Sequence, residues 1–440
     1  MNEKLRGFSF LLSPTFAMTQ NTPDFARVCG PFIEKLFSDV RELTRSPAPR
    51  RGVTRLGYSP EEDRTVEYLK RAGEALGLES EVDGAGNLWL TLPGRDRSLP
   101  ALVSGSHADS VLDGGNYDGL AGIAAAFCPV LWLKATGIVL PRDYRVLVLR
   151  SEEQGLVGST GLLGKLKPVD LDRRFIAGAP TLGELLAGHG LDVEKLTGGK
   201  PLMDLTKIAA FFEAHIEQSS KLDNSKTARV GLVTGIRGIR LNRKIRAIGV
   251  GAHAGAIDFP FRHDAACACA RFVSHIYDKW AHALAMGDDL VVTTGSIRTP
   301  DTAIPNKIAG ECEMTLDMRS LDDEAFERFS AVIDRELDQI AQEMGVTFES
   351  DPSIIIPPNH SDPVLMAHLR KGAESLGIGV MEMPSGAGHD AANFGAAGIP
   401  FAMLFIANQK GSHNPDEAMK MDDFLAAARV LTEALIRYDE

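Results

Sequence analysis

Histidine and aspartate side chains lie close together just after an apolar run at residues 101–105. The run is short and bounded by turn residues, which predicts a buried strand. His107 and Asp109 follow it two residues apart, so on an extended chain they share one face, and Asp109 could fix which ring nitrogen meets a metal ion. A lone histidine is most often structural. The glycine pair at 114–115, which lets the chain turn and bring Asp118 back, favours a ligand site instead.

Two adjacent carboxylates, Glu152 and Glu153, follow a second apolar strand predicted at 144–149. Adjacent buried carboxylates are costly unless cations or protons compensate their charge. A metal ion would supply that compensation, and one glutamate could bind it while the other removes a proton from water. Taken alone, the segment is equally consistent with a solvated acidic turn.

Two further histidines complete a candidate ligand set. His215 follows a third predicted strand at 209–212, and His413 lies in a loop ahead of the last predicted helix. The inner-shell candidates are then three imidazoles and two carboxylates: His107, Asp118, Glu153, His215 and His413. Such nitrogen and oxygen ligands suit Zn, Mn, Co or Ni better than Mg or Ca. A carboxylate such as Asp118 can bridge two ions, which together activate water for attack on a poorly reactive amide.

The elements that must position these residues alternate between strand and helix. This order predicts an α/β catalytic domain with a mainly parallel sheet and helices on both faces. Residues 237–356 differ, because strands there are interspersed with two long helices at 261–285 and 322–344, the pattern of an inserted α+β domain. We therefore expect a catalytic domain in two parts, with an extension before it. The expected segments are 1–22 (extension), 23–236 and 357–440 (catalytic domain) and 237–356 (insertion).

Composition restricts the partners. A chain of 440 residues exceeds what one core usually serves, so two domains are expected. The net charge of -12 disfavours a nucleic-acid surface, and no apolar run approaches the roughly 20 residues of a membrane span. With a nucleic-acid surface disfavoured, small ligands are the expected partners. Five cysteines without a C-x-x-C spacing predict free thiols in a reducing compartment, and so a cytoplasmic protein.

Six motifs occur in order along the chain: GSHADSVLDGGNYDG, SEEQG, EAHIEQ, GAHAG, SGAGHD and GSHNPDE. Through them the chain resembles the M20 metallopeptidase superfamily, specifically its branch of N-carbamoyl-L-amino acid hydrolases, allantoate amidohydrolases and β-ureidopropionases. The resemblance runs from about Pro23 to Tyr438. It implies a hydrolase that releases the carbamoyl group or ammonia from a small ureido carboxylate. It also implies that the inserted domain is a lid and a dimer interface, so that the protein is a homodimer.

The resemblance also implies residue roles. Two divalent ions per subunit, zinc or else manganese, cobalt or nickel, would share one carboxylate. Their ligands would be His107, Asp118 and His215 for one ion, and Asp118, Glu153 and His413 for the other. Glu152 would be the general base, and His253 would reach the partner's active site and stabilise the oxyanion. The peptide before Gly119 is the family's site for a cis bond.

Six residues match the family's substrate-binding positions: Gln218, Asn306, Arg319, Gly386, Ala387 and His389. Arg319 could hold a substrate carboxylate through two parallel hydrogen bonds, or it could simply pair with Asp317 or Asp322. The lid departs from the family pattern at 256–259, where Ala-Ile-Asp-Phe replaces Thr-Thr-Pro-Met. It departs again at 306–310, where Asn-Lys-Ile-Ala-Gly replaces Asn-Val-Ile-Pro-Gly. These departures bear on substrate identity more than on metal chemistry.

Two alternatives remain. A peptidase or aminoacylase of the same superfamily would cut a peptide or N-acyl amino acid, but those relatives usually carry an acidic ligand where His215 stands and lack Gln218. A metal-free binding or scaffold member of the fold is disfavoured because every ligand candidate and Glu152 are present.

Overall fold

The computed structural model describes residues 23–439, apart from the side chain of Arg243, so the expected extension at 1–22 lies outside the described residues. The chain divides into two compact units. Unit 1 comprises the described residues of Met1–Thr234, Ser361–Met383 and His389–Glu440, and unit 2 comprises Gly235–His360 and Pro384–Gly388. The last segment was expected in the catalytic domain. It groups with unit 2, where the amide of Arg237 donates to the carbonyl of Ser385 (3.1 Å).

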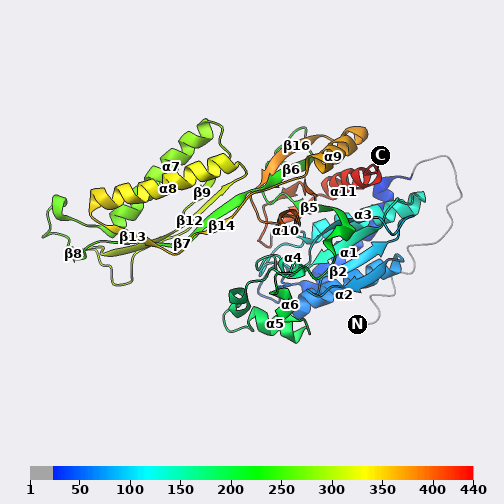
Figure 1. The fold of residues 1–440 in the computed structure, drawn as a ribbon, viewed down its shortest axis with the longest axis horizontal. Helices are drawn as coiled ribbons and strands as arrows, with labels where there is room; N and C mark the ends of the chain where they lie inside the picture. The colour runs from blue at the N-terminus through cyan, green and yellow to red at the C-terminus, as the bar shows by residue number, and fades with distance from the viewer. Residues whose placement is uncertain (1–22, 440) are drawn as a thin grey trace. The chain divides into compact units, whose positions relative to one another are not determined.

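Unit 1 is built on a mixed sheet whose central strands are parallel (Figure 1). The strand order is β1-β2-β4-β3-β5-β17-β6, with β16 beside β6. The parallel centre, β4-β3-β5-β17, confirms the predicted fold class. The strands are β1 (Glu79–Val82), β2 (Leu88–Leu92), β3 (Ala101–His107), β4 (Tyr144–Leu149), β5 (Ile208–Ile216), β6 (Val230–Ile236), β16 (Val380–Ser385) and β17 (Phe401–Ile406), with the short hairpin β18 (Asn408–Gln409) and β19 (Ala418–Met419).

Helices cover both faces of this sheet. Phe212 of β5 belongs to the large apolar core, whereas the ring of Phe211 stacks on Phe394 of α10 at 4.2 Å on the opposite face. The helices on the core face are α1 (Phe25–Thr44), α2 (Pro60–Ala75), α3 (Leu120–Thr136), α9 (Pro363–Leu376) and α11 (Met421–Ile436). Helices α4 (Val157–Leu162) and α10 (Asp390–Ala396) contact each other, and α5 (Leu182–Gly188) and α6 (Val193–Leu196) complete the unit.

Helix α3 is the central helix of the core face. Nearly all its side chains are buried, so it reads as apolar all round instead of amphipathic. Gly122 allows a close approach to the sheet, since a Cβ there would lie 2.0 Å from the carbonyl oxygen of Ala214 on β5. The approach fixes the start of α3, and with it the loop that carries Asp118, against the ends of β3 and β5.

Unit 2 has a sheet of order β10-β12-β7-β13 covered by two long helices. Residues of β12 alternate between buried and, after the exposed Glu311, partly buried, and Met314, Leu316 and Met318 face the helices. Its elements are β7 (Gly238–Ile248), β8 (Ala252–His253), α7 (Ala265–Ala285), β9 (Val291–Thr293), β10 (Ile297–Arg298), β11 (Lys307–Ile308), β12 (Glu311–Ser320), α8 (Asp323–Met344), β13 (Thr347–Ser350), β14 (Ile354–Ile356) and β15 (Asn359–His360). That this unit acts as a lid and dimer interface remains a prediction.

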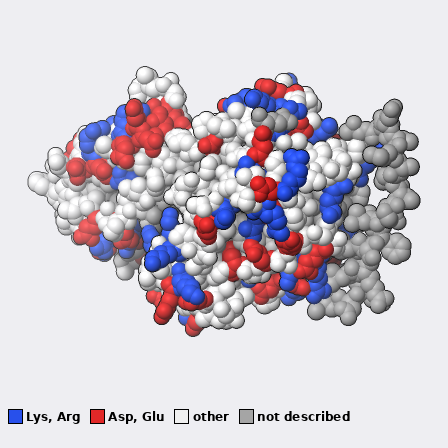
Figure 2. All heavy atoms as spheres, turned by 45° about the vertical axis from the view of Figure 1, so that its right-hand side comes forward, with Lys and Arg blue, Asp and Glu red and all other residues white. Residues whose placement is uncertain are grey.

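Charged side chains are mixed on the surface. On the face drawn in Figure 2, basic and acidic residues of the described chain occur in small interspersed groups instead of one extended basic surface. Among the described residues, no helix combines the length and apolar character that crossing a bilayer requires.

The contrast between two helical glycines gives a test of the fold. Gly122→Ala should destabilise the protein by about 1–3 kcal/mol through overpacking against the sheet. Gly188→Ala, in the last turn of α5, should instead be neutral or stabilise it by up to about 1 kcal/mol, because a Cβ there meets nothing within 4 Å. Urea unfolding of the two variants measures the difference. Equal effects of the same sign would contradict the close contact between α3 and β5.

Candidate metal centre

The candidate ligands come from segments at one edge of the parallel strands. His107 is the last residue of β3, and His215 is the next-to-last residue of β5. Glu153 lies on the turn after β4, and His413 lies in the loop between β18 and β19. Parallel strands present their carboxyl ends at one edge, which is where open α/β sheets bind ligands.

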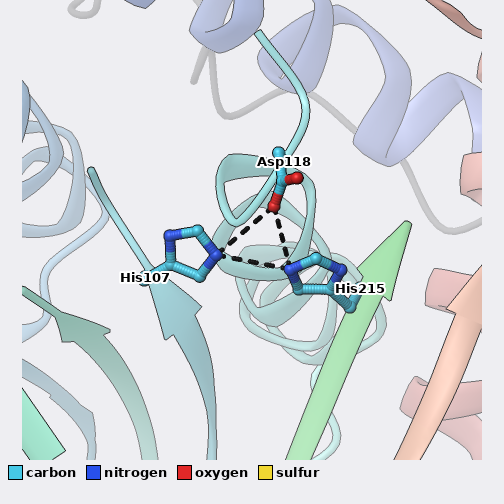
Figure 3. Close-up of side chains that lie close together, drawn as sticks. All are labelled: His107, Asp118 and His215. Atoms are coloured by element: carbon cyan, nitrogen blue, oxygen red, sulfur yellow. Dashed lines mark hydrogen bonds and ion pairs between the residues drawn. The ribbon is translucent and has the colours of Figure 1, made fainter. Parts of the chain in front are cut away.

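Three side chains form the first group, shown in Figure 3. The Nε2 atoms of His107 and His215 lie 3.3 Å apart. Asp118 Oδ1 lies 3.4 Å from His107 Nε2 and 3.1 Å from His215 Nε2. Ligand atoms about 2.0–2.1 Å from a tetrahedral zinc ion are separated by about 3.3–3.4 Å. The triangle therefore has the size that a metal ion of this kind requires.

Hydrogen bonds made by the Nδ1 atoms of His107 and His215 leave the lone pairs of their Nε2 atoms pointing into this triangle. His215 Nδ1 lies 2.9 Å from the carbonyl oxygen of Ile216, which can only accept, so Nδ1 carries a proton. His107 Nδ1 faces Asp109 Oδ1 at 3.2 Å and donates likewise. In the neutral rings both Nε2 atoms are then acceptors that face each other and a carboxylate oxygen. Such acceptors repel unless a cation or protons lie between them.

The second group shares Asp118 with the first. His413 Nε2 lies 3.4 Å from Asp118 Oδ2 and 3.2 Å from Glu153 Oε2. Glu153 Oε1 is buried without a hydrogen-bond partner among the described residues, an arrangement that calls for a cation. The two oxygens of Asp118 thus face different groups, as a bridging carboxylate would. The described residues are positioned to bind metal, and their donor set fits the predicted ions.

Asp109 connects both groups. Besides orienting His107, its carboxylate accepts the backbone amides of Glu152 (2.9 Å) and Glu153 (3.1 Å). Glu152 Oε2 comes to 4.0 Å from His107 Nε2, so this side chain borders the first group. One buried carboxylate therefore sets the orientation of a ligand histidine and of the glutamate pair.

Burial and charge shift the titration of these groups in opposite directions. Burial favours the neutral imidazole, but Glu152 and Asp109 raise the pKa of His107 well above its ordinary value. Burial also favours the neutral acid, yet His215 and His107 hold the pKa of Asp118 well below its usual range. Burial raises the pKa of Glu152 well above normal, because a buried carboxylate loses its hydration. The imidazoles and carboxylates thus stabilise each other's charged forms, and a bound metal ion would take over this compensation of the acids.

Backbone strain accompanies these residues. Ser151, Gln218 and His413 have positive φ angles of 53°, 63° and 58°, each costing about 1–3 kcal/mol in a non-glycine residue. The strained peptide of Ser151 is held by Glu62, which accepts its amide (2.9 Å) and the Nε of Arg150 (2.8 Å). Glu62 was not identified from the sequence, because an acidic residue in the first turn of a helix reads as solvated; the structure buries it completely.

Two predicted substrate contacts of unit 1 lie beside the ligands. Gln218 donates from Nε2 to Asp118 Oδ2 at 3.0 Å. The buried ring of His389 lies edge-on to His215, with centroids 4.6 Å apart, and burial together with His215 holds the pKa of His389 well below its ordinary value.

The expected cis bond before Gly119 is wrong. Among the described residues the one cis peptide is Ala48–Pro49. Gly119 makes the turn with a φ of 66°, which a glycine adopts without a side-chain clash. A Cβ at this position would also lie 2.4 Å from the ring of His107, so glycine allows the histidine to reach the site.

The other predicted site residues lie in unit 2, in two separate places. His253 of β8 pairs with Lys307 of β11, and the amide of Ala254 donates to the carbonyl of Asn306 (2.9 Å), so His253 and Asn306 are neighbours. Arg319 is the next-to-last residue of β12, at the end of this strand that lies away from His253 and Asn306.

Arg319 makes the ion pair that the sequence left open. Its Nε and Nη2 bind the two carboxylate oxygens of Asp317 at 2.8 and 2.9 Å, and the partner is not Asp322. Its Nη1 donates to the carbonyl of Gly386, and Ala387 follows with its amide on Ser385 Oγ (3.1 Å). Three of the five guanidinium N–H groups are thereby used, which leaves two for another ligand.

Comparisons with known proteins agree on one family. A profile of the peptidase family M20/M25/M40 matches residues 101–437. The chain is 32% identical to an allantoate amidohydrolase of Escherichia coli K12 over 89% of this chain and 93% of that protein. It is 29% identical to an N-carbamoyl-L-amino-acid amidohydrolase of Paenarthrobacter aurescens, over 92% and 98% of the two chains. A crystal structure of a hydantoinase/carbamoylase-family amidase from Burkholderia multivorans superposes with a TM-score of 0.82 at 26% identity, covering 93% and 97%.

Replacing Asp109 tests the geometry of the centre. Asp109→Asn should weaken metal binding by about 10- to 100-fold, because the amide cannot accept from His107 and from both glutamate amides at once. Asp113→Asn, on the same loop and paired with Arg50 at the surface, is the matched control and should bind metal like the wild type. Calorimetric titration of metal-free protein gives both affinities. Wild-type affinity in Asp109→Asn would show that this carboxylate does not orient the ligands.

Proposed function

This chain belongs to the peptidase family M20/M25/M40, and on that basis we propose that it is a metal-dependent amidohydrolase of small ureido or carbamoyl carboxylates. The observation that carries the proposal is the convergence of four side chains, from separate segments of the sequence, on the carboxylate of Asp118. The named activities of the two amidohydrolase relatives support the class of bond, a linear C–N bond outside a peptide.

The proposed ligands divide between two ions. His107, Asp118 and His215 would hold one, and Asp118, Glu153 and His413 would hold the other, with zinc, manganese, cobalt or nickel as the metal. When bound, such ions lower the pKa of water and polarise the carbonyl to be attacked. Glu153 Oε1 is buried and has no hydrogen-bond partner within the described part of the chain, which supports a metal-binding protein over a metal-free scaffold of the same fold.

Glu152 is the proposed general base. It borders the first ligand group, and Asp109 fixes its backbone. From there its carboxylate can take a proton from the attacking water and return it to the leaving nitrogen. Burial supports this exchange, since it raises the pKa of Glu152 and so makes the carboxylate a stronger proton acceptor.

His253 is the proposed oxyanion donor. The amide of Gly255 donates to its Nδ1 at 3.1 Å, so the neutral ring carries its proton on Nε2. The residue is exposed, and this N–H can serve a substrate carbonyl outside its own unit. Asn306 lies next to it and would contact the same substrate.

A single copy of unit 2 cannot bring its proposed contacts to one small substrate. His253 and Asn306 lie beyond the Glu311 end of β12, and Arg319 lies near the Ser320 end; Figure 1 shows β8 and β14 at opposite ends of the unit. Eight residues of extended strand separate the ends by about 27 Å. We therefore infer that two copies of the chain complete each site, and that the protein acts as a homodimer. The five free cysteines support a reducing compartment, which we propose is the cytoplasm.

The substrate class follows from the groups that would hold it. Arg319, with the turn of Gly386 and Ala387, would bind a carboxylate through its two remaining N–H groups, and Gln218 and His389 would contact the ureido end. A peptidase or aminoacylase is the alternative. His215 and Gln218 favour the ureido class, because peptidase relatives usually carry an acidic ligand at the first position and lack the glutamine.

Ammonia release tests the proposed reaction. Enzyme loaded with zinc or manganese should release ammonia from N-carbamoyl-L-amino acids, allantoate or 3-ureidopropionate, but should not cleave dipeptides or N-acetyl amino acids.

Glu152→Gln tests the proposed base. The variant should keep its metal and lose turnover by about 10²- to 10⁴-fold, which is the usual contribution of general acid–base catalysis. Peptide cleavage without ammonia would favour the peptidase, and near-normal turnover of Glu152→Gln with full metal would refute the base.

Mixing two inactive variants tests the shared site. His253→Ala and Glu152→Gln should each be inactive alone, but mixed dimers contain one site with an intact Glu152 and the partner's His253. Random exchange in a two-fold dimer then restores about one quarter of wild-type activity. Refolded or coexpressed mixtures can be assayed directly. If mixing restores nothing although hybrid dimers form, His253 does not act across subunits.

A further inference from the structure

A completely buried arginine lies beneath the loop that carries Asp118. Arg55 donates from Nε to the carbonyl of Ala108 (2.7 Å), and from Nη2 to the carbonyls of Asn116 (3.5 Å) and Asp118 (3.4 Å). The amide of Arg55 donates to Ser110 Oγ (3.1 Å), and the carbonyl of Arg55 accepts the amide of Ser110 (3.0 Å). Arginine is almost never fully buried unless it is paired, so this placement needs a compensating role.

Glu417 approaches the same loop through its amides. Its Oε1 accepts the backbone N–H groups of Tyr117 (2.7 Å) and Asp118 (3.3 Å), and the side chain is buried. Gly115 makes room for it, because a Cβ at that position would lie 2.1 Å from the Glu417 carboxylate. The glycine that the sequence pattern associates with a sharp turn thus also admits an acidic side chain to the loop.

Together the two side chains hold the backbone of Asp118 through both of its hydrogen-bonding groups. Glu417 takes the N–H and Arg55 takes the C=O. Burial lowers the pKa of Arg55, and the carboxylates of Glu417, Asp109, Asp118 and Glu153 act against that shift. The backbone of a proposed metal ligand is thus held at both of its polar groups by buried charged side chains.

We propose that Arg55 and Glu417 are positioning residues of the metal centre, which clamp the peptide of Asp118 so that its carboxylate stays aimed at both ligand groups. The inference rests on the proposed metal-dependent function. Neither residue touches the substrate or a metal ion in this scheme.

Substitutions of the clamp should change metal binding in a graded way. Arg55→Lys keeps the charge but loses the forked hydrogen bonds, and Glu417→Met keeps the shape but loses the acceptor. Each should weaken manganese binding by about 10- to 100-fold, the range for groups that orient metal ligands. Glu417→Gln retains an acceptor oxygen and should recover most of the affinity, whereas a merely space-filling role predicts no difference between the Met and Gln variants.

Matched controls come from exposed neighbours. Arg50→Lys changes an arginine that binds Asp113 on the same loop (2.8 Å), and Asp416→Asn changes the exposed residue next to Glu417, which pairs with Arg51. Both should bind manganese like the wild type. Calorimetry gives the affinities, electron paramagnetic resonance reports the exchange coupling of paired manganese ions, and urea unfolding of the metal-free proteins reports stability.

The outcomes separate the clamp from a purely structural role. Wild-type affinity and coupling in both Arg55→Lys and Glu417→Met would overturn the proposal, whatever happens to stability. If Arg55→Lys does not fold, Gly115→Ala displaces Glu417 without changing any charge, and it should show the same loss of affinity. A wild type that binds one uncoupled manganese would contradict the two-ion function, while the affinities of the variants would still decide the clamp.

Discussion

Repulsion between buried acceptor atoms is the constraint on which the site depends. Two imidazole nitrogens and a carboxylate oxygen meet within 3.1–3.4 Å, and the other oxygen of the same carboxylate faces a third imidazole. No such arrangement persists without positive charge at its centre. Protons can supply that charge, as the raised pKa of His107 indicates, and a metal ion supplies more of it with better geometry.

The fold meets this constraint by placing rigid supports behind each ligand. Parallel strands bring His107 and His215 to one edge, and a helix packed closely through Gly122 fixes the loop between them. Asp109 ties that loop to the glutamate turn, and Glu62 holds the strained peptide from which the turn begins. The strained peptide of Ser151 is thus held by a buried charge, which is a usual setting for strain at functional sites.

Much of the fold and of the candidate site could be predicted from the sequence, for physical reasons. Apolar runs ending in polar residues predict strand ends, so the parallel centre of the sheet and the places of His107 and His215 followed from local pattern. His413 entered the candidate set from its residue type and loop position, but its pairing with Asp118 and Glu153 around one ion came from the resemblance. Buried charges such as Glu62 could not be predicted, since a helix-start glutamate looks solvated, and the pairing of Arg319 with Asp317 instead of Asp322 depends on which side chains share a strand face.

The most direct test is a crystal structure of metal-loaded protein with anomalous scattering from zinc or manganese. The account predicts two peaks per chain, about 3.5–4 Å apart, one on each side of the Asp118 carboxylate. A single peak away from Asp118, or fully loaded and active enzyme with no metal at these ligands, would contradict it.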